Sequence, residues 1–105
     1  MDKQLKKEWL KALRSGKYRQ ADGALCITRN KRNSYCCLGV LARVAGAKFH
    51  GRVPYLDGIQ IGGGDQEYLT PGFAGLNPRT QETLGSMNDE GHKFSEIADW
   101  IEKNL

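Results

Sequence analysis

The sequence predicts a small α+β domain in which about four helices pack on a small antiparallel sheet built from β-hairpins. Two observations support this prediction. Apolar residues recur with helical spacing near both ends of the chain. In the middle, short apolar stretches flank turn-forming residues, which is typical of hairpins. At 105 residues the chain has the length of one domain, so we expect residues 1–105 to form a single domain.

The first expected element is an amphipathic helix over residues 4–14. Leu5, Trp9 and Leu13 follow one another at intervals of four residues, which places them on one helix face. Gly16 comes directly after this pattern. Because glycine readily adopts the left-handed conformation that often follows a last helical turn, we expect the helix to end there.

The next part predicts a hairpin followed by a buried helix. Residues 23–28 predict a short strand, and the polar residues 29–33 predict the hairpin loop. The following stretch is apolar on all sides up to Gly46, which is typical of a helix inside the core. Gly39 lies within this stretch, and a glycine there indicates close approach to another element.

Residues 47–76 form the least regular part of the sequence. An Asp-Gly pair at 57–58 lies between short apolar runs and predicts a second hairpin. The glycine run Gly62–Asp65 lacks the strand-to-helix frame and the Lys-Ser/Thr of a phosphate-binding P-loop, so we expect a flexible loop. A Thr-Pro pair at 70–71 predicts one helical turn.

The C-terminal part predicts two further helices. Asn77 and Pro78 form a helix start signal, and the helix is expected over residues 78–86. Residues 88–91 are typical of a turn. The last helix is expected over residues 94–104, where apolar residues follow helical spacing and the outer face is acidic.

Charge is distributed unevenly along the chain. Residues 1–33 carry ten lysines and arginines against three acids, whereas the remainder carries six against nine. Clustered like charges repel one another and weaken a compact fold, so a basic cluster indicates that one face meets an anion. Taken by themselves, the lysines and arginines along one face of the first helix are typical of a solvent-exposed helix surface. However, basic residues continue beyond the helix through Lys17 and Arg19.

We therefore expect a ligand-binding cleft that combines basic side chains with tyrosines. Arginine holds phosphates through paired hydrogen bonds, and tyrosine stacks on nucleobases. The candidate residues are Arg14, Lys17, Tyr18, Arg19, Gln20, Arg29, Arg32 and Tyr35. They line one cleft if the hairpin folds back on the end of the first helix. For Tyr18 and Tyr35, packing in the core remains an equal alternative to ligand contact.

The cysteines and histidines indicate neither disulfides nor a metal site. Cys26, Cys36 and Cys37 are odd in number and two are adjacent, so we expect reduced, buried thiols. A nucleophilic role for Cys36 or Cys37 at a helix start stays open. His50 and His92 are far apart in the sequence, and we expect no metal and no cofactor.

The sequence shows no signal for secretion or for membrane insertion. No apolar stretch approaches the ~20 residues that span a bilayer, and the N-terminus lacks the apolar segment of a secretion signal. We therefore expect a cytoplasmic protein without membrane contact.

Three groups of residues carry a family resemblance. The chain has Trp9 followed by LRSGKYRQ at residues 13–20, YCCLGVL at residues 35–41, and MNDEGHKFSEIADWIE at residues 87–102. With these motifs it resembles a group of small proteins common in bacteriophage genomes. The resemblance covers most of the chain except residues 47–76.

This resemblance implies a phage accessory protein that acts in the host bacterial cytosol. Such proteins often block host defence by gripping a defence protein or by sequestering its nucleotide signal. The resemblance supplies no catalytic residue. The chain has Lys93 where the group's pattern has a serine or threonine that caps the last helix, so we expect the cap to move to Ser95.

We expect a non-enzymatic protein that binds and sequesters an anionic nucleotide second messenger in a basic cleft. An inhibitor that covers an acidic host protein with a basic surface is one alternative, favoured by a flat face rather than an enclosed pocket. A nucleic-acid-binding module is another, although the acidic last helix is unsuited to recognition. Asp89 and Glu90 beside His92 are more typical of a polar turn than of an active site, so we expect no enzyme. A homo-oligomer stays open.

Overall fold

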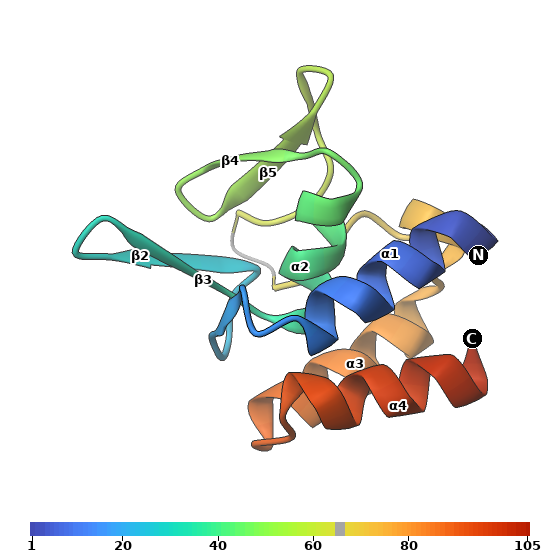
Figure 1. Ribbon diagram of the computed structural model, residues 1–105. Coiled ribbons are helices and arrows are strands. Elements are labelled where there is room, and N and C mark those ends of the chain that lie inside the picture. Colours follow the sequence, from blue (N-terminus) through green and yellow to red (C-terminus); the bar gives the residue numbers. More distant parts are fainter. Residues whose placement is uncertain (65–66) are drawn as a thin grey trace.

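The computed structural model describes residues 1–64 and 67–105, and it has an α+β fold, as expected. A layer of helices lies beside two small three-stranded sheets (Figure 1). Within the described residues there are four α-helices: α1 (Lys3–Arg14), α2 (Cys37–Val44), α3 (Pro78–Asp89) and α4 (Phe94–Asn104). None of these helices has the length and apolar character needed to cross a membrane.

Helix α1 forms as the sequence predicts. Its first turn is capped by Asp2, whose carboxylate accepts a hydrogen bond of 2.8 Å from the Leu5 N–H. Trp9 and Leu13 are buried, which confirms the apolar face. Gly16 follows the helix with a φ of 75°, the left-handed conformation expected at this position.

The first sheet consists of β1 (Arg19–Gln20), β2 (Cys26–Arg29) and β3 (Arg32–Tyr35), in the order β1-β3-β2. Strands β2 and β3 form the expected hairpin, although β2 begins three residues later than predicted. The predicted loop 29–33 is too long, because Arg29, Arg32 and Asn33 pair within the strands and only residues 30 and 31 form the turn. The two residues of its turn, Asn30 and Lys31, have φ values of 52° and 63°, as the tight turns of hairpins require. Strand β1 pairs with β3 in parallel, so this sheet is not purely antiparallel.

The second sheet consists of β4 (Lys48–His50), β5 (Val53–Leu56) and β6 (Ile59–Gln60), all antiparallel. The Asp57-Gly58 pair forms its second turn, as predicted, and both residues have positive φ. The structure therefore has two sheets where we expected one. Of the predicted loop Gly62–Asp65, the last residue lies outside the described residues, whereas Gly62 is held in a bridge with Leu69.

Helix α2 lies at the centre of the helical layer and contacts both α1 and α3, while α1 also lies along α4 (Figure 1). The helices pack mainly on one another, not on one side of a sheet as we expected. Gly39 confirms the predicted close approach, because a Cβ atom at this position would lie 1.9 Å from the Leu25 carbonyl oxygen.

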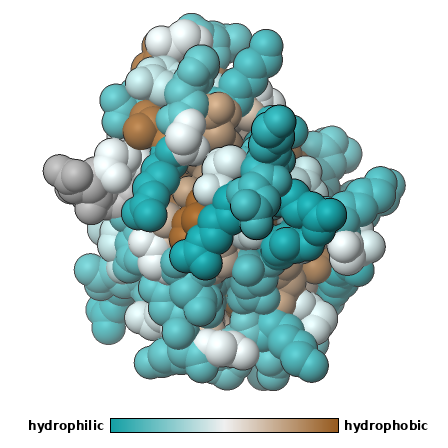
Figure 2. Space-filling view, turned by 90° about the vertical axis from the view of Figure 1, so that its left-hand side faces the viewer, coloured by the Kyte–Doolittle hydropathy of each residue, from teal (hydrophilic) through white to brown (hydrophobic). Residues whose placement is uncertain are grey.

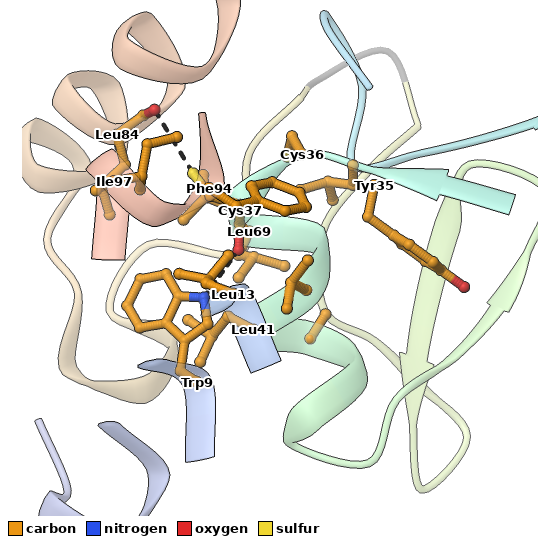
Figure 3. Packing of buried hydrophobic residues seen from close by; sticks show 14 of the residues in the cluster. Trp9, Leu13, Tyr35, Cys36, Cys37, Leu41, Leu69, Leu84, Phe94 and Ile97 are labelled. Atoms are coloured by element: carbon orange, nitrogen blue, oxygen red, sulfur yellow. Dashed lines mark hydrogen bonds between the residues drawn. The ribbon is translucent and has the colours of Figure 1, made fainter. Parts of the chain in front are cut away.

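The core joins three helices through side chains that pack around Cys37 (Figure 3). The indole N–H of Trp9 donates a hydrogen bond of 2.9 Å to the Cys37 carbonyl. The Cys37 thiol lies 3.6 Å from the Leu84 carbonyl in α3. Trp9, Cys37 and Leu84 are fully buried, so these contacts fix α1, α2 and α3 relative to one another.

Two predictions for the C-terminal part are wrong. Helix α3 continues to Asp89, three residues beyond the predicted end, because Asn88 is buried inside the fold and is not part of an exposed turn. The N-cap of α4 is Lys93, not Ser95. Its backbone N–H donates a hydrogen bond of 2.9 Å to the Glu96 carboxylate, which satisfies the helix start without a serine or threonine. The helical turn expected to open at 70–71 begins instead at Phe73, in the 3₁₀-helix η1 (Phe73–Gly75), so its predicted start is also wrong.

Candidate functional site

The register of the first sheet brings three arginines to one of its faces. Arg29 pairs directly with Arg32 across the hairpin, and Ser34 lies between Ile27 and Arg19 on the two neighbouring strands. Paired residues, and residues two apart along a strand, point to the same side of a sheet. These five residues therefore share one face, which we call the arginine face.

The positive charges of the arginine face are not neutralised within the described part of the chain. Ion pairs among the described residues involve only Arg14 and His92. Arg29 and Arg32 are exposed and directly opposite each other, an arrangement that destabilises a sheet. Strongly hydrophilic residues project from the middle of the side toward which the hairpin points, with apolar residues visible between them (Figure 2). This surface therefore offers hydrogen-bond donors to an external anion.

A cavity of about 280 Å³ adjoins the arginine face. Its lining consists of Gln20, Ala21, Asp22, Ile27, Arg29 and Ser34. The Gln20 side chain is fixed there, because its amide group donates to the Asn88 side chain at 3.0 Å and to the His92 carbonyl at 2.8 Å. The cavity thus combines donors from Arg29 and Ser34 with an acceptor from Asp22.

Arg14 lies away from this face and bridges two helices. Its guanidinium donates hydrogen bonds to Asp99 at 2.7 Å and to Glu102 at 3.1 Å, both on α4. These bonds raise the pKa of Arg14. Part of the basic first helix is therefore matched by the acidic last helix inside the molecule.

Lys17 and Tyr18 line a separate groove beside α1, together with Glu8, Lys11 and Val44. The Tyr18 ring meets the Tyr35 ring edge to face, with centroids 5.6 Å apart. Tyr35 is buried and also packs against Phe49 of the second sheet at 5.5 Å. Of the two alternatives for Tyr35, the structure thus shows core packing.

The structure therefore does not bring the eight predicted residues into one cleft. Arg19, Arg29 and Arg32 share the arginine face, and Gln20 lies beside it in the adjoining cavity. The remaining four are distributed between the α1–α4 contact, the groove beside α1 and the core: Arg14, Lys17, Tyr18 and Tyr35.

A second cavity was not predicted from the sequence. It has a volume of about 590 Å³ and lies on the second sheet. Its lining consists of Gly46, Lys48, His50, Tyr55, Asp57 and Gly58. The only sequence signal there is the Asp-Gly turn, which predicts a hairpin but not which side chains share a face.

The three cysteines are free and buried. The Cys36 thiol caps α2 by accepting a hydrogen bond of 3.4 Å from the Gly39 N–H, and burial raises its pKa to about 12. Burial also raises the pKa of Cys37. Low solvation opposes the thiolate that a nucleophile requires. Within the described residues, no three His, Cys, Asp or Glu side chains converge in an arrangement that could hold a metal ion.

Fold and site together define a small α+β domain with two sheets and an arginine-bearing sheet face. Residues 1–51 match the model of a family described as a domain of unknown function, DUF8296. The matched residues run from α1 to β4 and include the whole arginine face. No curated protein and no solved structure matches the chain.

Proposed function

We propose that this protein binds a nucleotide-type anion on the arginine face and does not catalyse a reaction. The observation that carries the proposal is the placement of Arg19, Arg29 and Arg32 on one sheet face without carboxylate partners among the described residues. Guanidinium groups bind phosphate through paired hydrogen bonds. Binding of this kind needs only donors, and no group has to transfer a proton.

The shape of the surface favours a chain of nucleotides over a single nucleotide. Pockets that enclose small molecules usually have volumes of about 300–1,000 Å³ and cover most of the ligand. The cavity beside Arg29 lies just below this range, at about 280 Å³, and the hairpin projects from the body of the protein (Figure 1). An extended phosphate backbone can contact all three arginines without being enclosed.

The setting that we propose is the cytosol of an infected bacterium. The resemblance to phage proteins supports this setting, and three free thiols are compatible with a reducing compartment. There the protein would compete with a host defence system for a nucleic acid or a nucleotide signal. An acidic host protein is the alternative ligand for the same face, because arginine binds the carboxylates of a protein as well as the phosphates of a nucleotide.

Fluorescence anisotropy with labelled single-stranded RNA, single-stranded DNA and duplex DNA tests the proposal. Each neutralised phosphate contributes about −0.7 to the slope of log K against log salt for a single strand. Three arginine contacts therefore predict a slope of about −2. The double variant Arg29→Gln/Arg32→Gln should weaken binding and reduce the slope to about −0.7.

The matched control is Arg79→Gln/Lys103→Gln, which removes the same charge from exposed positions on α3 and α4. This control should bind like the native protein. Equal losses in both double variants would show that net charge, and not the arginine face, determines affinity. Polyglutamate that competes as well as the nucleic acids would favour an acidic protein as the ligand and refute the nucleotide proposal.

A further inference from the structure

The second cavity lies on the opposite side of the two sheets from the arginine face. Lys48 and His50 alternate with Phe49 along β4, so they point away from it. Phe49 packs against Tyr35 of the first sheet, whose side chain in turn points away from the arginine face. The two outer faces are therefore separated by the aromatic contact between the sheets.

The cavity has an aromatic ring between a cation and a carboxylate. Lys48 pairs with Tyr55 across the two strands, and Asp57 follows Tyr55 by two residues. Opposite residues on antiparallel strands have Cα atoms about 5.5 Å apart or less, and Asp57 lies two residues beyond Tyr55 in the turn after β5, so the Cα atoms of Lys48 and Asp57 are at most about 13 Å apart. The His50 ring meets the Tyr55 ring edge to face, with centroids 5.3 Å apart.

The two charged residues are available to a ligand. Neither Lys48 nor Asp57 takes part in an ion pair with another described residue. The turn itself does not require a carboxylate at position 57, because the φ of 51° there suits asparagine or glycine equally well. The carboxylate is therefore free to recognise a partner.

We propose that this cavity binds a guanine nucleotide. Tyr55 provides a stacking surface for the base, and the Lys48 ammonium group meets the phosphate. An ionised carboxylate only accepts hydrogen bonds. The Watson–Crick edge of guanine presents two adjacent N–H donors, at N1 and N2, which match both oxygens of Asp57. Adenine presents only one N–H donor, and beside it lies an acceptor nitrogen. This acceptor repels the second carboxylate oxygen, so adenine can make only one of the two hydrogen bonds.

This proposal does not depend on the proposed function, because the two sites share no residue. Titration of the ¹⁵N-labelled protein with guanosine 5′-monophosphate and adenosine 5′-monophosphate, followed by amide chemical shifts, tests it directly. We expect the guanine nucleotide to shift the resonances of β4 and β5 and to bind about tenfold or more tightly than the adenine nucleotide.

Two variants separate the roles of the charged residues. Asp57→Gly keeps the turn, since glycine adopts positive φ without strain, and should abolish the preference for guanine. Lys48→Gln should reduce the affinity for both nucleotides by the same factor. The amide spectrum of each variant reports whether it is folded. Equal binding of the two nucleotides to the native protein would overturn the proposal, as would an unchanged preference in Asp57→Gly or shifts confined to the β2–β3 hairpin.

Discussion

Replacement of Gly39 by alanine tests the closest backbone contact in the structure. A Cβ atom at position 39 would lie 1.9 Å from the carbonyl oxygen of Leu25 and 2.9 Å from its carbonyl carbon. The obstacle is main chain, so no rotamer change relieves it. The Leu25 oxygen also accepts a hydrogen bond of 3.3 Å from the Cys36 N–H, and a shift of this carbonyl weakens that bond.

The expected loss is about 3 kcal/mol of unfolding free energy. Overpacking of a core costs ~1–3 kcal/mol, and a buried donor left without its partner costs ~1–3 kcal/mol. The higher helix propensity of alanine returns ~1 kcal/mol. Since a domain of this size is stable by ~5–15 kcal/mol, the variant loses a large fraction of its stability. Its Tm should fall by more than about 12 °C.

Gly85→Ala is the matched control, because Gly85 is also a buried helical glycine. Its added Cβ would meet the ring of Tyr68 at 3.1 Å, and the end of a side chain can move. We expect a change within about 1 kcal/mol. Urea and thermal unfolding, followed by circular dichroism, measure both variants. Equal stabilities of Gly39→Ala and the native protein would refute the argument.

Three further predictions concern the polar and ionisable groups. Asn88→Ala should cost ~2–4 kcal/mol in urea unfolding, because it leaves the Cys37 N–H and the Ala21 carbonyl without their partner; a loss below 1 kcal/mol would contradict this. Because the Cys36 pKa is about 12 in the fold, the native state keeps a proton that the unfolded chain releases above pH 9. Stability should thus fall between pH 9 and 12 by at least about 1.4 kcal/mol per pH unit, because Cys37 adds to the effect of Cys36, and a flat profile would show that these thiols are solvated. Arg14→Ala should lower the unfolding free energy by at most about 1 kcal/mol, and by less in high salt, because its ion pairs with Asp99 and Glu102 are partly exposed. The same variant should leave nucleic-acid affinity unchanged, and a reduced affinity would place Arg14 in the binding site.

Elements whose signals are local could be predicted from the sequence. The spacing of Trp9 and Leu13 predicts α1, and the Asp-Gly pair at 57–58 predicts the turn of the second hairpin. Gly39 marks a close approach because a single missing side chain is visible in an otherwise apolar helix. Each of these signals depends on residues that lie close together in the sequence.

Features that depend on distant pairing could not be predicted. The two-residue strand β1 is too short to leave a periodic pattern, so its parallel pairing with β3 was missed. Arg14 meets partners 85 and 88 residues away, and nothing near it in the sequence reveals them. The arginine face was only partly predicted, because the residues could be named as basic but their common side follows from strand register.

The side-chain amide of Asn88 ties the start of α2 to a part of the chain that is synthesised much later. It accepts a hydrogen bond from the Cys37 N–H, 51 residues earlier, and donates one to the Ala21 carbonyl, 67 residues earlier. During translation, the segment that holds the three arginines leaves the ribosome before this amide exists. The Cys37 N–H at the start of α2 must therefore wait without its partner until α3 arrives, so a nascent chain that stalls before Asn88 should stay open to proteases and chaperones.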